Sequence, residues 1–153
     1  MNTDIIYEFK DGIGKGKEYY SNGKLLYEGE YIKEERHGKG KEYYDNDELK
    51  YEGEYSNGRK EGKGKEYYSN GKLLFEGEYL DGKKWNGKGY NMNKEIIYEI
   101  KDGNGKVKEY NNYGTLEFEG EYLNGERNGK GKEFDSNGKL LFEGEYLNGK
   151  RNE

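Results

Sequence analysis

The stretch YEGEYSNGRKEGKGKEYYSNGKLL, residues 51–74, decides the fold, because the chain repeats it along most of its length. Counted from the first glycine of its GKG motif, which reads GKV once, full copies begin at Gly14, Gly38, Gly62, Gly105 and Gly129. A contracted copy begins at Gly87, and a fragment of another opens the chain. A step of about 24 residues is typical of stacked supersecondary units rather than of one globular core.

These copies divide the chain into units of a single repeat domain that spans residues 1–153. The units cover approximately 2–13 (partial), 14–37, 38–61, 62–86, 87–104 (contracted), 105–128 and 129–153. Because each unit is too small to bury an apolar face alone, we expect neighbouring units to stack and pool their apolar surfaces.

The composition by itself suggests disorder, but the placement of the aromatic residues argues against it. Only 29% of residues are hydrophobic and 39% are charged, with a mean hydropathy of −1.46. Disordered chains are poor in aromatic residues, whereas here they make up 16%, and the 18 tyrosines recur at fixed repeat positions. We therefore expect a folded repeat array.

One repeat reads as a β-hairpin. GKGKEYY (Gly62 to Tyr68) is a short, partly aromatic strand, and KLLFEGEYL (Lys72 to Leu80) is the returning strand. Between them, Ser69-Asn70-Gly71 contains the dipeptide Asn-Gly, which favours a tight type I′ turn. The high glycine content disfavours helix, so the sequence predicts an all-β protein.

Alternation along the returning strand sorts its side chains onto two faces. Leu73, Phe75, Gly77 and Tyr79 fall on one face, and Leu74, Glu76, Glu78 and Leu80 fall on the other. The first face predicts a structural ladder of aromatic–Gly–aromatic triplets, which are Tyr27/Gly29/Tyr31, Tyr51/Gly53/Tyr55, Phe75/Gly77/Tyr79, Phe118/Gly120/Tyr122 and Phe142/Gly144/Tyr146. Glycine at these positions would let an aromatic ring lie over bare backbone.

The repeat resembles the MORN repeat, with its Y-x-G-x-Y opening, N-G turn and G-x-G. The segment YEGEYIKEERHGKGKEYY (Tyr27 to Tyr44) also keeps an R-H-G-x-G connection, at Arg36, His37, Gly38 and Gly40. This resemblance implies an elongated single-layer solenoid of consecutive antiparallel β-hairpins. The segment KEYYSNGKLLFEGEY is similar to a bacterial variant of these repeats, some members of which are described as antitoxins.

The recurring glutamate pair, Glu76 and Glu78 in one copy, has the residue types of acid–base catalysis or cation binding. The neighbouring strand carries Lys63 and Lys65, so cross-strand pairing of opposite charges accounts for the pair without a site. Five near-identical copies of the pair also argue against one special environment. We therefore assign the pairs to sheet stabilisation.

No other catalytic, metal or cofactor site is expected. No Gly-Lys is followed by the Ser or Thr of a phosphate-binding loop. In the calcium-loop-like DGNGK, Lys106 stands where an oxygen ligand is needed. Cysteine is absent, and the single histidine, His37, reads as a solvated loop residue between repeats. The sequence thus predicts a protein that is not an enzyme.

The repeat pattern breaks at Trp85, the only tryptophan, which looks like a one-residue insertion before the contracted copy. Because exposed aromatic residues anchor interfaces, Trp85, Tyr90 and Met92 are the candidate partner-binding residues. The alternative, which we favour, is that Trp85 fills the packing gap that the contraction leaves. The segment of residues 85–104 also reads as a junction between two halves of the array.

The leading hypothesis is a non-catalytic scaffold that binds another protein through a sheet face or groove. A peripheral phospholipid binder is the alternative, with Lys83, Lys84 and Lys88 as a candidate basic strip, and an antitoxin-like neutraliser of a partner toxin is the third. Self-association through edge strands is possible, and the net charge of −5 makes nucleic acid an improbable partner. Without a signal peptide, membrane span or cysteine, an intracellular, cytoplasmic location is the simplest expectation.

Overall fold

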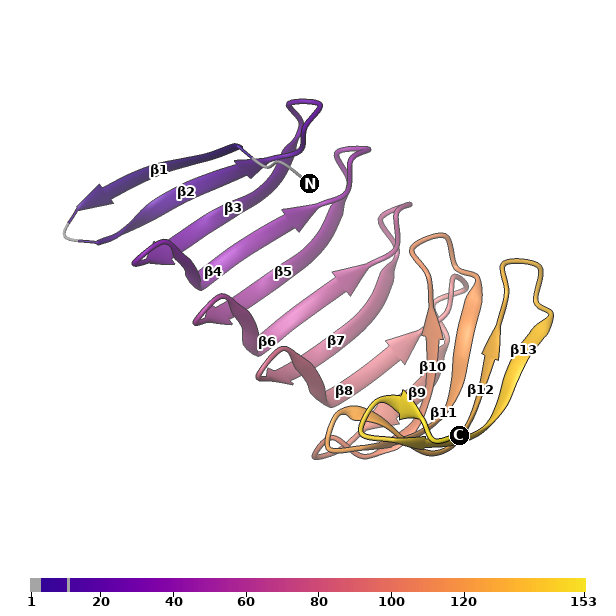
Figure 1. The fold of residues 1–153 in the computed structure, drawn as a ribbon. Coiled ribbons are helices and arrows are strands. Elements are labelled where there is room, and N and C mark those ends of the chain that lie inside the picture. Colours follow the sequence, from indigo (N-terminus) through magenta and orange to yellow (C-terminus); the bar gives the residue numbers. More distant parts are fainter. Residues whose placement is uncertain (1–3, 11) are drawn as a thin grey trace.

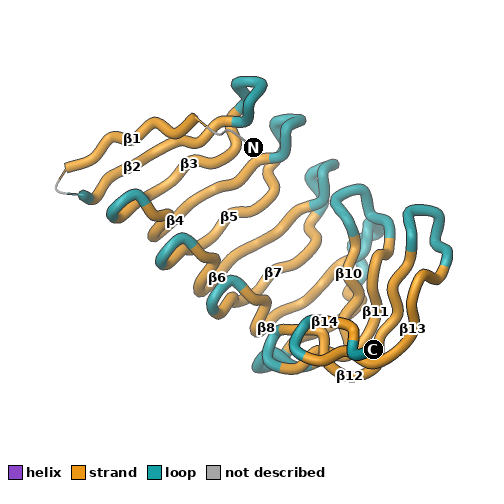
Figure 2. Tube along the Cα trace, viewed as in Figure 1, coloured by secondary structure: helices purple, strands orange, loops and turns teal. Residues whose placement is uncertain are grey.

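The structure, a computed structural model that describes residues 4–10 and 12–153, is built entirely from antiparallel β-strands in this part of the chain (Figures 1 and 2). The first sheet contains β1 (Asp4–Lys10), β2 (Ile13–Tyr19), β3 (Leu25–Ile32), β4 (Glu35–Tyr43), β5 (Leu49–Ser56), β6 (Arg59–Tyr67), β7 (Leu73–Leu80), β8 (Lys83–Tyr90) and β9 (Ile96–Ile100). The second contains β10 (Gly105–Tyr110), β11 (Leu116–Leu123), β12 (Glu126–Phe134), β13 (Leu140–Leu147) and β14 (Lys150–Arg151). Strands pair in chain order within each sheet, so the predicted all-β array of hairpins is confirmed. Residues 2, 3 and 11 of the expected partial unit lie outside the described residues.

The turn type predicted for Ser69-Asn70-Gly71 is wrong. Gly71 has a positive φ of 85°, but Asn70 does not, and the amide of Gly71 donates to the carbonyl of Tyr68. This is a three-residue hairpin loop that ends in a left-handed glycine. The paired positive φ values of a type I′ turn occur instead at the opposite edge, for example at Asn57 and Gly58.

The expected alternation of side chains also slips at one point in each hairpin. The register shifts between Glu66 and Tyr67, so that Glu66 lies opposite Phe75 while Tyr67 lies opposite Leu73. This bulge turns Leu73 away from the aromatic face and leaves Leu74 packed against the core. The alternation predicted Leu73 on the aromatic face and Leu74 on the other face, so both assignments are wrong.

The aromatic triplets line one face of each sheet and form the core. The ring of Tyr27 lies over Gly40 of the next strand, where an added Cβ would come within 2.6 Å of the tyrosine Cε2. Tyr27 is fully buried, and its ring meets those of Tyr31 and Tyr55 edge to face, with centroids 5.5 and 5.4 Å away. Glycine pairs such as Gly29–Gly40 therefore make the space that the rings occupy.

Charged side chains cover the rings on the same face. The hydroxyl of Tyr31 donates to Glu18 at 2.7 Å, and Arg36 bridges Glu18 and Glu42 at 2.6 and 2.9 Å. The guanidinium of Arg36 also lies 4.1 Å from the centre of the Tyr27 ring. Each repeat thus joins a carboxylate, a cation and an aromatic ring in one contact.

The same contact recurs along the array with lysine or arginine as the cation. The cations over the first ring of each aromatic triplet are Arg36, Lys60, Lys84, Arg127 and Arg151. Their carboxylate partners are Glu18, Glu42, Glu66, Glu109 and Glu133. We call this series, whose members are half-buried except for the exposed Arg151, the charge ladder.

The sheet breaks where two glycines of the central row are replaced. Ile100 takes the glycine position in β9, opposite Gly87, and Val107 takes it in β10, opposite Gly120. Both side chains are 3% exposed and belong to the core. Because their bulk fills the space that bare backbone leaves elsewhere, β9 and β10 share only the isolated bridge Lys101–Asn104.

The second sheet turns at this break and docks against the end of the first (Figure 1). Ser69 in the β6–β7 loop donates to the carbonyl of Asn112 through its amide and hydroxyl, at 2.9 and 2.8 Å. At the opposite edge, Lys83 forms an ion pair with Glu126 at 2.7 Å. The contracted copy therefore lets the hairpins on either side of it touch directly.

We expect Gly40→Ala to lower the free energy of unfolding by about 1–3 kcal/mol, because the added methyl group would push the Tyr27 ring out of its position. Gly58→Asn is the control, since Gly58 has a positive φ that asparagine tolerates and nothing within 4 Å of an added Cβ. Urea denaturation followed by circular dichroism measures both. Equal losses in the two variants would contradict the role of the bare glycine.

We also expect acid to weaken the ladder through Glu66. Burial opposes ionisation of this carboxyl, but Lys84, Lys60 and Tyr79 outweigh it and lower its pKa from 4.5 to about 2. The stabilisation is therefore present above pH 4.5 and is lost as the pH falls toward 2. Glu66→Gln should be less stable at neutral pH, and its free energy of unfolding should fall less steeply over that acidic range. The free energy of unfolding of both proteins is measured by denaturation at several pH values between 4.5 and 2. An equal fall in the wild type and in Glu66→Gln would refute this prediction.

Candidate functional site

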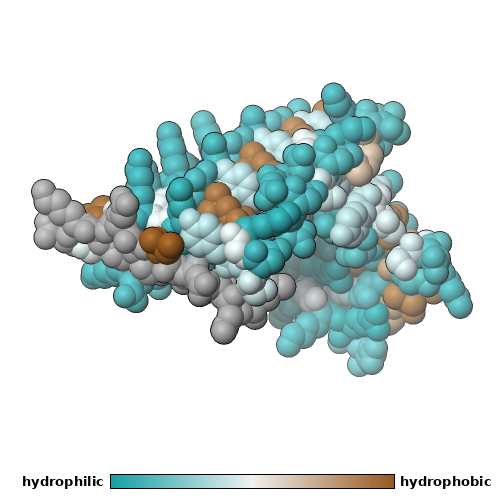
Figure 3. All heavy atoms as spheres, turned by 90° about the horizontal axis from the view of Figure 1, so that it is seen from above, coloured by the Kyte–Doolittle hydropathy of each residue, from teal (hydrophilic) through white to brown (hydrophobic). Residues whose placement is uncertain are grey.

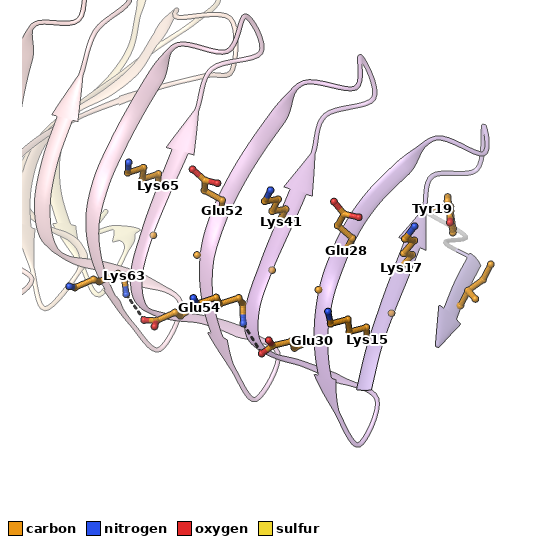
Figure 4. Close-up of a pocket in the computed structure, with 17 residues that line it drawn as sticks. Lys15, Lys17, Tyr19, Glu28, Glu30, Lys41, Glu52, Glu54, Lys63 and Lys65 are labelled. Atoms are coloured by element: carbon orange, nitrogen blue, oxygen red, sulfur yellow. Dashed lines mark hydrogen bonds between the residues drawn. The ribbon is translucent and has the colours of Figure 1, made fainter. Parts of the chain in front are cut away.

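The face opposite the aromatic core is hollowed into a groove across the first sheet. This N-terminal groove has a volume of about 1080 Å³. Its lining residues are Ile6, Lys15, Gly16, Lys17, Tyr19, Glu28, Gly29, Glu30, Lys39, Gly40, Lys41, Glu52, Gly53, Glu54, Lys63, Gly64 and Lys65. The backbone of the glycine row forms its floor, and lysine and glutamate side chains stand on either side (Figure 4).

The charges in this groove are arranged by strand. β2, β4 and β6 each contribute two lysines, and β3 and β5 each contribute two glutamates. Lys17 lies opposite Glu28, and Lys41 lies opposite both Glu28 and Glu52, so sign alternates from one strand to the next. The groove therefore presents five charged bands in the order basic, acidic, basic, acidic, basic.

The glutamates of the groove are held in place by donors of their own chain. Tyr43 and Tyr67 donate their hydroxyls to Glu28 and Glu52 at 2.7 and 2.6 Å. Burial and the hydrogen bond to Glu28 raise the pKa of Tyr43 to about 12, so its hydroxyl remains a donor at neutral pH. In the other row, backbone amides bind the carboxylates of Glu30 and Glu54.

The lysines of the groove are less constrained. All six are exposed, and none of their ammonium groups lies within 4 Å of a carboxylate among the described residues. The expected cross-strand partners do face each other in register, as Lys65 and Glu76 show, but of these facing pairs only Lys132 and Glu143 approach within 4 Å, at 3.7 Å. The rows therefore balance charge across the strand spacing instead of forming closed ion pairs.

A second, smaller groove crosses the same face of the second sheet. This C-terminal groove has a volume of about 680 Å³ and shares no lining residue with the first. It is lined by Ile97, Lys106, Val107, Lys108, Glu119, Gly120, Glu121, Lys130, Gly131, Lys132, Glu143, Gly144 and Glu145. Phe134 stands where the first groove has Tyr43 and Tyr67, so Glu119 lacks the hydroxyl donor that orients Glu28 and Glu52.

A third cavity, of about 340 Å³, lies at the junction of the two sheets on the aromatic side. Lys84, Glu66 and Glu109 face it together with five tyrosines. Burial alone would lower the pKa of Lys84, but the Glu66 carboxylate outweighs it and the pKa rises to about 12. Lys84 is therefore a cation of the charge ladder and not a free amine nucleophile.

The three candidate partner-binding residues lie at separate points of this junction. The ring of Trp85 abuts Gly103, where an added Cβ would lie 2.7 Å from its Cζ3, and Met92 abuts Gly114 in the same way. Tyr90 donates its hydroxyl to Glu76 at 2.8 Å. All three are half-buried, so the placement favours packing, and a binding role for them stays a prediction.

Two sequence predictions, the insertion at Trp85 and the loop position of His37, are wrong. Only Trp85 and Asn86 separate Lys84 from Gly87, whereas a full copy has three residues between Lys60 and Gly64, so the connection carries a deletion and not an insertion. His37 lies half-buried within β4 and not in a loop. The described residues contain no cluster of metal-ligating side chains.

The sequence predicted binding through a sheet face or groove but did not place the groove on the lysine and glutamate face, although signals for that placement are visible. A tyrosine recurs at the end of the first strand of the hairpins, except at Phe134, and Tyr43, Tyr67 and Tyr90 each donate to a glutamate. The grouping of lysines and glutamates by strand can also be read from GKGK and EGE. Only the curvature of the assembled sheet shows that these charged bands line the N-terminal groove.

We expect Trp85→Ala to cost about 2 kcal/mol or more of the free energy of unfolding, because it empties the contact with Gly103 between the two sheets. Tyr113→Ala is the control, since Tyr113 is 74% exposed and should change stability by less than about 0.5 kcal/mol. Thermal and urea unfolding measure both. Small and equal effects would leave the Trp85 ring available for a partner.

Comparison with known families agrees with the repeat structure. The MORN repeat matches residues 51–72, and the MORN repeat variant matches residues 13–33, 36–57 and 127–148. No curated protein matches the chain. No helix in the described ranges is long or apolar enough to pass through a membrane. Together the repeat matches cover about half of the sequence, and the chain belongs to the MORN-repeat proteins, whose non-catalytic repeats are generally associated with binding of proteins or membrane lipids.

Proposed function

We propose that this protein is a non-catalytic scaffold that binds a segment of another protein in the N-terminal groove. The observation that carries the proposal is the groove itself, with a glycine floor, glutamates held by their own chain and six lysines that have no carboxylate within 4 Å in the part of the chain that the structure describes. Sites that recognise a partner are usually formed before binding, because a preformed surface avoids the entropic cost of ordering. The continuous sheet supplies that rigidity.

A protein partner fits this surface better than a membrane does. Binding to anionic lipid needs a basic surface, whereas acidic and basic strands alternate here. The candidate basic strip is not free either, since Lys83 pairs with Glu126 and Lys84 with Glu66. A flat bilayer would also meet the rims of a hollow before its floor.

The surface chemistry also indicates polar recognition. Seen from above, most of the molecule is hydrophilic, and hydrophobic side chains appear only in separate patches (Figure 3). Large continuous apolar patches mark hydrophobic interfaces, and none is visible in this view. Complementary charge would therefore set specificity and the rate of association more than raw affinity.

The test compares capture of partners from native lysate by the wild-type chain and by two charge-reversed variants. Lys41→Glu places an acid in the central basic strand of the groove, and we expect it to reduce recovery of a specific partner by roughly tenfold or more. Lys139→Glu makes the same charge change in a turn outside both grooves and should leave recovery unchanged.

Two results would contradict the proposal. One is capture that is lost in Trp85→Ala but retained in Lys41→Glu, which would move the site to the junction. The other is salt-sensitive sedimentation with anionic vesicles and no protein captured, which would favour the lipid-binding alternative. Circular dichroism of each variant confirms that the repeat array is still folded.

A further inference from the structure

We propose that the N-terminal groove selects an α-helix whose groove-facing side chains alternate between acidic and basic every half heptad. This inference rests on the proposed function and deepens it, because it names the conformation and charge order of the bound segment. The helix would lie across the strands, with acids opposite β2, β4 and β6 and bases opposite β3 and β5.

The spacing of the charged bands carries the argument. Hydrogen-bonded strands lie about 4.8 Å apart, and the row Lys17, Glu28, Lys41, Glu52 and Lys65 crosses five adjacent strands. Four strand spacings place the first and last charges about 19 Å apart. A bound segment that meets every band must therefore present a side chain about every 4.8 Å.

A helix meets this requirement and an extended chain does not. Half a heptad of α-helix, 3.5 residues, advances about 5.3 Å, so four steps cover about 21 Å. Same-face side chains of a strand are about 6.7 Å apart, so four steps cover about 27 Å. Over four steps, the side chains of the helix fall out of register with the charged bands by about 2 Å, which flexible side chains absorb. Those of an extended chain fall out of register by about 8 Å and meet a band of the wrong sign.

The order of charges follows from the alternation of the bands. The groove is lined by six lysines and four glutamates, and the alternating row continues beyond β6 with Glu76 of β7. A uniformly acidic segment would face the glutamates of β3 and β5, where like charges repel each other. Over β2 to β6 the best complement therefore alternates three acids with two bases along its groove-facing stripe.

The two charge rows give the helix contacts on both flanks. On each strand the paired charges are two residues apart, as Lys15 and Lys17 are, which is about 6.7 Å. A helix with side chains is about 10–12 Å across, so one row reaches each side while the axis lies above the glycine floor. The hydrogen bonds from Tyr43 and Tyr67 hold Glu28 and Glu52 in one row along one side of the glycine floor.

The probes are three fluorescent alanine-based peptides offered to the full chain at low salt. The matched peptide has a glutamate at every seventh position and a lysine midway between successive glutamates. The second has the same composition with its charges spread around the helix, and the third places proline at the centre. Fluorescence anisotropy should show the matched peptide binding at least tenfold tighter than each of the others.

The double variant Lys41→Glu/Glu52→Lys tests the order of charges while preserving net charge and the opposite-charge pair between β4 and β5. It sets like charges opposite Glu28 and Lys65. We expect it to weaken binding of the matched peptide at least tenfold, while Lys139→Glu leaves it unchanged. Because Glu52 accepts the hydroxyl of Tyr67, Lys41→Glu alone is a second variant that retains this bond, and it should show the same loss. Unfolding curves establish that each variant is folded.

The inference is overturned if the charge-spread or proline peptide binds as tightly as the matched one, or if the folded double variant binds it unchanged. Either result, with partner capture still lost in Lys41→Glu, would leave the proposed function standing with another kind of segment in the groove. Capture that is unaffected by Lys41→Glu would reject the proposed function itself. The two failures are therefore distinguishable.

Discussion

The close approach of aromatic rings to bare backbone is the constraint on which the rest of this structure depends. Each ring of the Tyr27 type needs glycine in two neighbouring strands, because a single methyl group would overlap it. A single-layer sheet has no second sheet to bury its apolar face, so the rings must lie flat across their own strands and pack edge to face. The glycine row therefore lets the rings be buried within one sheet, whereas in β-sandwiches a second sheet buries the apolar face.

The charge ladder covers the core that the rings form. A cation such as Arg36 covers a tyrosine ring and joins carboxylates of two successive repeats, so it closes the core against water and links neighbouring units. Where the repeat contracts, Lys84 keeps only one of its two carboxylates within 4 Å, because Gly89 occupies the position of the second. The ring of Tyr98 fills that place instead.

Much of the architecture could be predicted from the repeat alone. The hairpins, the antiparallel order and the aromatic triplets follow from local alternation and glycine placement, which are properties of neighbouring residues. The turn at Ser69 to Gly71 and the faces of Leu73 and Leu74 were misassigned for one reason. A bulge adds a residue to one strand only, and a single sequence does not show to which strand.

By itself the sequence determined that this chain is a stack of β-hairpins and where its regular pattern ends, because period and alternation are encoded residue by residue. Only the tertiary structure decided that the array divides into two sheets at Ile100 and Val107 and that the lysine and glutamate strands line two separate grooves. The physical reason is that breaks and hollows arise from the combined bulk and curvature of many strands. The repeat specifies each contact, whereas the concave surface exists only when the strands are assembled.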